Sequence, residues 1–170
     1  MNEKDLKFNT SYGFQVDLAS VADEIVAFME KKPKASYRVT IGSDSELLED
    51  KMADFVTAVV VHRIGNGGRY FWRRVKLGKF YNLHDRIVQE VMLSIDASSA
   101  FLNVLKTKIQ AKAEGGENFN WSFEIHVDVG ENGPTKTLIQ EVVGMVRAHN
   151  FEPKTKPESY AASNVADIYA

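Results

Sequence analysis

Two stretches of the sequence place an aspartate at the end of an apolar strand pattern. In YRVTIGSDSE, residues 37–46, apolar and polar residues alternate up to Asp44 and Glu46, the two-residue period of a strand with one apolar face. In EIHVDVGENGP, residues 124–134, a second apolar strand ends in Asp128. Carboxylates are costly to bury unless a positive charge compensates them. Each aspartate is therefore either a turn residue in solvent or a candidate cation ligand.

The cation-ligand interpretation depends on how the two strands are arranged in the sheet. If the two strands are parallel neighbours, Asp44 and Asp128 lie side by side at one sheet edge. Two carboxylates that close repel each other, and one takes up a proton unless a cation neutralises them. Hard divalent cations, which prefer oxygen ligands, meet that need. One strand ending in aspartate and glycine is common, whereas two in one domain favour the cation site.

Further acids lie in the helical patterns. Glu90 is one helical turn from Ile87 and lies near an apolar stripe, whereas Asp85 and Asp96 are better placed for solvent. Asp167 has apolar neighbours in the last helix. Taken singly, each acid is more often a surface or capping residue. Together with the two strand-end aspartates, Glu90 and Asp167 complete the set that a two-metal site requires.

The elements that must position these acids follow from hydrophobic periodicity. Residues 1–16 have no regular pattern. Helical patterns cover residues 17–33, 82–118 (with a possible break near Ser98-Ser99), 133–150 and 159–170. Strand patterns cover residues 37–43, 53–65, 69–78, 119–130 and 151–158. The first three strands are joined by short turns and form an antiparallel meander, so the order of elements predicts a mixed sheet with helices packed on its faces.

Composition limits the class of protein. The chain has 170 residues, of which 44% are hydrophobic and 26% are charged, which suits one domain: a lead-in and helix over 1–35 and a core over 36–170. The absence of cysteine excludes disulfides and thiolate zinc sites. No apolar run reaches membrane-spanning length and the N-terminus lacks a signal-peptide pattern, so we expect a cytoplasmic protein without a membrane partner.

The order of elements and several motifs resemble the RNase H-like fold. IGSDSE, FYNLHDRI, HVDVG and KPESYAASNVAD resemble those of a bacterial family of small, uncharacterised RNase H-like proteins described as nucleases. The resemblance runs from about residue 37 to the end and includes Phe8-Asn9. It implies an α/β fold with a five-stranded mixed sheet: three antiparallel strands are followed by alternating helices and strands, with helices on both faces and an extra N-terminal helix.

The resemblance also implies a chemistry and a set of site residues. Asp44, Asp128 and Asp167 match the family's strand and last-helix aspartates, and Glu90 matches its first-helix glutamate, with Asp85 as a rival. In such enzymes the acids are both catalytic residues and metal ligands. They hold two Mg²⁺ or Mn²⁺ ions about 3.5–4 Å apart and hydrolyse a phosphodiester of a nucleic acid.

Two other functions stay open. The basic segment with which some relatives grip a hybrid duplex is missing, and net charge is −2, which favours a non-catalytic nucleic-acid or protein binding module. Asp44-Ser45-Glu46 resembles the opening motif of 3′–5′ exonucleases of the same fold, and the role of Glu46 as an auxiliary ligand in this chain stays open. However, Ala162 and Ser163 stand where those enzymes carry histidine or tyrosine.

Basic residues that could contact a phosphate backbone gather in two places. The strand over 69–78 combines positive charge with aromatic residues, the type of surface on which bases stack, although a solvated sheet edge has the same composition. The candidate substrate-binding residues are Arg73, Arg74, Lys76, Lys154 and Lys156. The sequence does not distinguish RNA, DNA, a hybrid or a junction as substrate, or internal from terminal cleavage, and it leaves the oligomeric state open.

Overall fold

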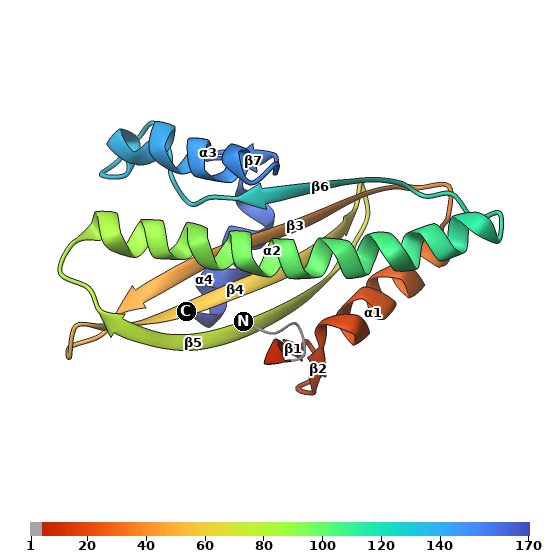
Figure 1. Ribbon diagram of the computed structural model, residues 1–170, viewed down its shortest axis with the longest axis horizontal. Helices are drawn as coiled ribbons and strands as arrows, with labels where there is room; N and C mark the ends of the chain where they lie inside the picture. Colours follow the sequence, from red (N-terminus) through yellow and green to blue (C-terminus); the bar gives the residue numbers. More distant parts are fainter. Residues whose placement is uncertain (1–4) are drawn as a thin grey trace.

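The computed structural model of the protein describes residues 5–170, apart from the side chains of residues 160–163. One mixed sheet runs through it in the order β2-β1-β5-β4-β3-β6-β7 (Figure 1). The strands are β1 (Lys7–Thr10), β2 (Gln15–Asp17), β3 (Ser36–Leu47), β4 (Met52–Arg63), β5 (Gly68–Lys79), β6 (Asn120–His126) and β7 (Pro153–Lys154). The helices are α1 (Leu18–Glu30), α2 (Leu83–Glu114), the short 3-10 helix η2 (Lys136–Leu138), α3 (Ile139–Ala148) and α4 (Tyr160–Tyr169).

The centre of the sheet matches the sequence prediction. Strands β3, β4 and β5 form an antiparallel meander, and β6 pairs with β3 in parallel. In that parallel pair Gly42 lies opposite His126. Asp44 and Asp128 each follow two residues later, so the register brings both aspartates to the same level at the carboxyl ends of their strands. The condition on which the sequence analysis made a shared cation site depend, that these two strands are parallel neighbours, is met.

The prediction of five strands is wrong, because the lead-in adds two more. Residues 7–17 fold into the hairpin of β1 and β2, and β1 pairs with β5. Leu6 and Phe8 are buried in the main core, and the Asn9 side-chain amide donates a hydrogen bond to the Trp72 carbonyl. Strands of three or four residues are too short for an alternating pattern to reveal them. The hairpin is stabilised by burial that local sequence does not report.

The long helical pattern forms one helix, since α2 runs without interruption from Leu83 to Glu114, and the break left open near Ser98-Ser99 is absent. Ser94 and Ser98 are both buried, and the Ser94 hydroxyl is 2.8 Å from that of Ser43 on β3. Serine has only moderate helix propensity because its side chain competes for backbone hydrogen bonds. Here packing against the sheet outweighs that preference, and the small side chains allow the helix to approach closely.

Helices cover both faces of the sheet, as predicted. Helices α1 and α2 share a core with Val39, Ile41 and Val59 of the central strands, and α2 crosses the front of the sheet in Figure 1. Helix α4 lies behind the sheet in the same view and packs its Ala166 with Val56 and Ala58. Helix α3 packs against α2 and β6 through a second core.

The C-terminal end of α4 is fixed by side chains of β5. The Tyr169 ring stacks on Trp72 with ring centroids 4.3 Å apart, and its hydroxyl is 3.0 Å from that of Tyr70. The Arg74 guanidinium donates a hydrogen bond to the Tyr169 carbonyl, a favourable position for a cation at a helix C-terminus. The aromatic and basic side chains of this strand therefore hold the helix that carries Asp167.

The burial of the N-terminal hairpin leads to a stability prediction. Phe8 is 0% exposed, whereas Phe14 in the same hairpin is 71% exposed. Truncation of a fully buried phenylalanine costs about 3–5 kcal/mol of unfolding free energy. We expect Phe8→Ala to lose an amount of this order in a urea or thermal melt, and Phe14→Ala to lose little. Equal effects of the two substitutions would show that the hairpin is not part of the core.

Candidate active site

Asp44 and Asp167 meet on the face of the sheet that α4 covers. Along β3 the side chains of Ile41 and Ser43 point to the α2 side, where Ser43 contacts Ser94. Asp44, one residue on, points to the opposite side. There it forms a side-chain hydrogen bond with Asp167 of α4. Since two carboxylates can hydrogen-bond only when one holds a proton, this contact depends on protonation.

The pKa of Asp44 is raised from its ordinary value of 3.8 to about 6. Burial is the largest cause, followed among the raising effects by the negative charges of Asp128 and Asp167. A hydrogen bond from the backbone of Ser45 opposes the shift without cancelling it. Asp44 is therefore held in a position that disfavours its charge and that a cation would make favourable.

Glu90 reaches the same cluster from α2. Its side chain is buried, with 4% of the residue exposed, and its Oε1 accepts a hydrogen bond of 2.5 Å from the Ser45 hydroxyl. The pKa of Glu90 is raised to about 8, chiefly by burial and also by the charges of Asp44 and Asp128, while the Ser45 hydrogen bond and the charge of Arg86 oppose the shift. At neutral pH without a cation, Glu90 is mostly protonated.

Asp128 stands just past the end of β6 and is partly exposed. Its carboxylate forms an ion pair with Lys156, with 2.9 Å between Oδ1 and Nζ. Its charge acts on both Asp44 and Glu90. Asp44 thus interacts with all three other acids, so candidate residues from β3, from α2, from the loop after β6 and from α4 form one electrostatically coupled cluster.

The other acids considered in the sequence lie elsewhere. Asp85 is exposed in the first turn of α2, and hydrogen bonds from His84 and then Asn82 lower its pKa. Its backbone N–H is capped by the Asn82 side chain. Glu46 and Asp96 are exposed. Asp85 therefore belongs to the N-terminal cap of α2, more than a turn before Glu90.

The cluster has ligand atoms that suit a hard cation, but they are not arranged around a single metal position. All four side chains offer carboxylate oxygens, the ligands that Mg²⁺ and Mn²⁺ prefer. Over the residues that the structure describes, no group of three or more histidine, cysteine, aspartate or glutamate side chains is arranged to hold a metal ion. The residues fit such an ion by type and by the mutual repulsion of their charges, although only Glu90 is buried and Asp167 is exposed; their carboxylates would have to move together to bind it.

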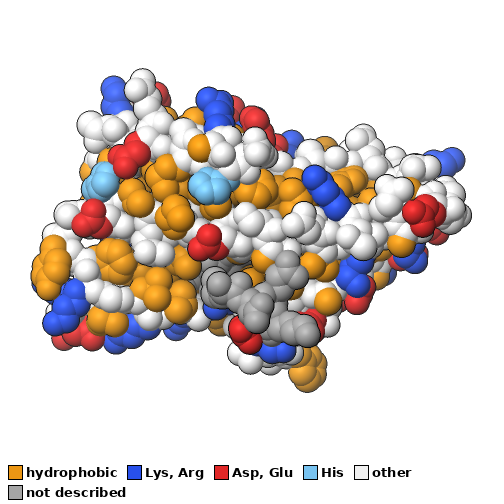
Figure 2. All heavy atoms as spheres, viewed as in Figure 1, with side chains coloured by type: hydrophobic (Ala, Val, Ile, Leu, Met, Phe, Trp, Pro, Cys, Tyr) orange, Lys and Arg blue, Asp and Glu red, His pale blue; other side chains and the backbone are white. Residues whose placement is uncertain are grey.

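The predicted substrate-binding residues do not share one surface. Arg74 holds Tyr169, and Arg73 is on the opposite face of β5, with burial lowering its pKa. Lys76 pairs with Asp50, and Lys154 pairs with Glu152. Figure 2 shows lysine and arginine side chains at several separate places on the face that carries α2. Of the five, Lys156 is the one with an ion pair to the acid cluster.

Sequence reasoning missed the hydroxyl groups that connect β3 to α2. The Ser43 hydroxyl contacts those of Thr57 at 2.9 Å and Ser94 at 2.8 Å, while Ser45 bonds Glu90. These contacts fix the register of α2 over the sheet and thereby the position of Glu90. The alternation in Ser43-Asp44-Ser45 contained the signal: if the acid faces one side of the strand, both serines face the helix on the other.

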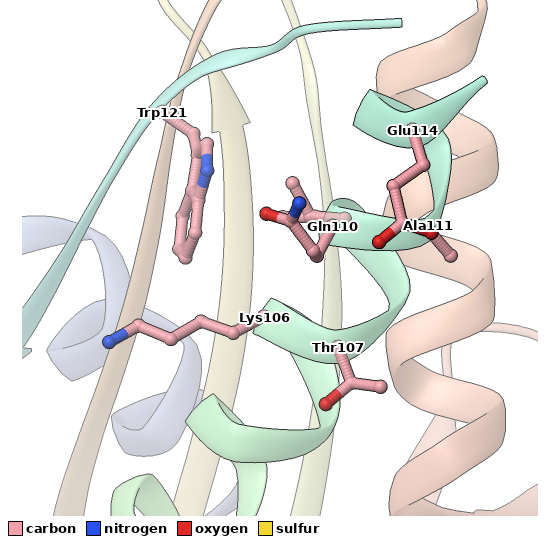
Figure 3. A pocket seen from close by; sticks show the side chains of 7 residues that line it. Lys106, Thr107, Gln110, Ala111, Glu114 and Trp121 are labelled. Atoms are coloured by element: carbon pink, nitrogen blue, oxygen red, sulfur yellow. The ribbon is translucent and has the colours of Figure 1, made fainter. Parts of the chain in front are cut away.

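A separate pocket lies far from the acids. It has a volume of about 620 Å³ and is lined near the C-terminal end of α2 by residues that include Lys106 and Gln110, facing Trp121 of β6 (Figure 3). Gln110 follows Glu90 by 20 residues of continuous helix, a separation of about 30 Å. No member of the acid cluster lines this pocket, so it is not part of the candidate active site.

Comparison with known proteins gives two matches. The model of a family described as Ribonuclease H-like matches residues 20–170. The chain is also 31% identical over 172 residues to the "Uncharacterized protein YkuK" of Bacillus subtilis (strain 168), with 99% of each chain covered. No solved structure matches the chain. Of the helices that the structure describes, none has the length and apolar character needed to cross a membrane.

The raised pKa of Asp44 leads to a prediction about how stability depends on pH. The pKa of Asp44 in the folded protein is about 6, above its ordinary value of 3.8, so the ionised form of Asp44 destabilises the fold. The free energy of unfolding therefore falls as the pH rises through 6. In a chelator at pH 7, we expect Asp44→Asn to keep the fold and raise Tm by roughly 2–4 °C. The gain should disappear near pH 4, where Asp44 is protonated in the folded state.

Thermal melts at the two pH values, with Asp96→Asn as the control, measure this effect. Asp96 is an exposed acid of α2, so its substitution should leave Tm nearly unchanged. A large loss of stability in Asp44→Asn at pH 7 would instead show that Asp44 is a structural cap.

Proposed function

The chain belongs to the Ribonuclease H-like family, and on that premise we propose that it is a nuclease that hydrolyses phosphodiester bonds with Mg²⁺ or Mn²⁺. The substrate is a nucleic acid, bound at the carboxyl ends of β3 and β6. A cytoplasmic location is part of the same proposal. Neither the type of nucleic acid nor the choice between internal and terminal cleavage follows from the site.

The observation that carries the proposal is the coupling of four acids from four different elements. A structural role explains a single capped or paired carboxylate, but it does not explain why Asp44 is partly buried and Glu90 is buried where their charges act against that of Asp128. Such an arrangement costs stability, which proteins tolerate at functional sites where a ligand offsets it. A divalent cation is the ligand that offsets several carboxylates at once.

The four acids would hold the cation. Bound there, Mg²⁺ or Mn²⁺ supplies an activated water and neutralises charge on the phosphate. Glu90 holds its proton until the cation arrives, because its pKa is about 8, and it must release that proton to become a ligand. Ser45 orients the Glu90 carboxyl group through its hydroxyl. The buried position of Glu90 also excludes water from that side of the site.

A non-catalytic binding module is the second candidate function. Two observations favour it: no three acids are arranged as a metal cage among the described residues, and Lys156 already neutralises Asp128. The two functions differ in what a divalent cation does. A nuclease binds it at the acids and requires it for activity, whereas a binding module retains its nucleic-acid affinity in a chelator.

Substitution of the two rival acids of α2 tests the nuclease. We expect Glu90→Gln to lower Mn²⁺-dependent cleavage at least about 100-fold, since loss of a ligand exceeds the 10–100-fold cost of losing a supporting residue. Asp85→Asn should retain activity, because Asp85 serves the helix cap. The assay uses labelled single-stranded RNA, single-stranded DNA, an RNA–DNA hybrid and a branched junction.

The pH dependence of the wild-type protein gives a second readout. Activity should rise between pH 6 and 8, as Glu90 becomes easier to ionise. If Asp85→Asn loses activity and Glu90→Gln keeps it, the acid that α2 contributes to the site is Asp85 and not Glu90. An active protein indifferent to both substitutions, or full activity in a chelator, would contradict the metal-dependent mechanism.

A further inference from the structure

The ion pair between Lys156 and Asp128 sets one acid of the cluster apart. Within the part of the chain that the structure describes, Asp44, Glu90 and Asp167 form no ion pair, whereas the Lys156 ammonium lies 2.9 Å from the Asp128 carboxylate. The two side chains are 56% and 27% exposed. The positive charge is therefore at the rim of the cluster, where a cation from solvent would also arrive.

The backbone places Lys156 at this point. The segment after β7 continues alongside the loop that follows β6, with hydrogen bonds from Val127 N–H to the Lys154 carbonyl and from Lys156 N–H to the Val129 carbonyl, 2.9 and 2.8 Å long. Gly130 permits the close approach, because a Cβ at that position would be 2.9 Å from the Lys156 Cβ. The stem of Lys156 is thus fixed, and its four-carbon side chain leads to Asp128.

This contact accounts for the open arrangement of the acids. When they are ionised, Asp44 and Glu90 repel Asp128, while the Lys156 ammonium attracts it. Lys156 therefore holds the Asp128 carboxylate in an ion pair that a divalent cation shared with the other acids would have to replace. We propose that Lys156 is the resident counter-cation of the acid cluster and competes with a divalent cation for Asp128. This inference rests on the proposed metal-dependent function. It adds that the Lys156–Asp128 ion pair must break before Asp128 can bind the metal.

The ion pair has the properties that such an exchange requires. Exposed ion pairs are weak because solvent screens them and because ordering a long side chain costs entropy. The Lys156 ammonium can swing into water while its stem stays anchored. A divalent cation interacts with several carboxylates simultaneously and therefore displaces a single ammonium from one of them.

Calorimetric titration of the metal-free protein with Mn²⁺ tests the competition. We expect Lys156→Met to bind Mn²⁺ about 5-fold more tightly than wild type, the equilibrium change that corresponds to loss of one weak competing ion pair. Lys156→Gln, which also removes the charge, should behave in the same way. Lys156→Arg, which restores a cation at the same stem, should return the affinity to within 2-fold of wild type.

Lys154→Met is the matched control. Lys154 lies two residues away and pairs with Glu152 outside the cluster, so its loss removes the same charge without freeing Asp128. Its Mn²⁺ affinity should stay within 2-fold of wild type. An unchanged or weaker affinity in Lys156→Met, or an equal gain in Lys154→Met, overturns the competition while leaving the metal site intact. If neither wild type nor Lys156→Met binds Mn²⁺, the proposed function fails and the competition fails with it.

Discussion

The parallel pairing of β3 with β6 is the constraint on which the candidate site depends. It aligns Gly42 with His126, and the two residues that follow in each strand carry Asp44 and Asp128 to the same sheet edge. A shift of one residue in this pairing would turn one of the aspartates to the other face. The pairing is itself secured by the apolar side chains of both strands, among them Ile41 and Ile125, which are fully buried.

Around this edge the protein holds carboxylates where their charge is disfavoured. Glu90 is brought in by α2, whose position over the sheet depends on the buried hydroxyl contacts of Ser43. Asp167 is brought in by α4, whose end is held by Trp72 and Arg74 of β5. The elements on both faces thus converge on one group of acids. Among the residues that the structure describes, Lys156 forms an ion pair with one of the four carboxylates and the charge of Arg86 acts on Glu90, yet the pKa values of Asp44 and Glu90 remain raised.

Most of the architecture that positions the acids could be predicted from the sequence. Strands β3, β4, β5 and β6 have long alternating or apolar patterns, and the helical periods are equally clear, so their order and the β3–β6 adjacency followed. The β1–β2 hairpin did not, because strands of three and four residues leave no period to detect. The sequence left open whether α2 continues through Ser98, since burial rather than local propensity decides it.

The site could be predicted only as far as the spacing of apolar residues indicates where strands end and which face of a helix is apolar. Asp44, Asp128 and Glu90 were singled out as candidates in this way, whereas Asp85 stayed a rival to Glu90 until the structure placed it in the N-terminal cap of α2. The roles of the basic residues were not, because a lysine or arginine on a strand gives no sign of its partner. Arg74 holds the end of α4, and Lys156 contacts Asp128; both contacts join segments far apart in the chain, which a local pattern does not connect.

The central claim is that Asp44, Glu90, Asp128 and Asp167 together bind a divalent cation. Anomalous X-ray diffraction from crystals soaked in Mn²⁺ tests it most directly, because manganese is located independently of any assumed ligand. The account predicts an anomalous peak between the carboxylates of Asp44 and Asp128, with the Lys156 ammonium no longer in contact with Asp128. Crystals that show no peak at the cluster, with the Lys156–Asp128 ion pair unchanged, would contradict it.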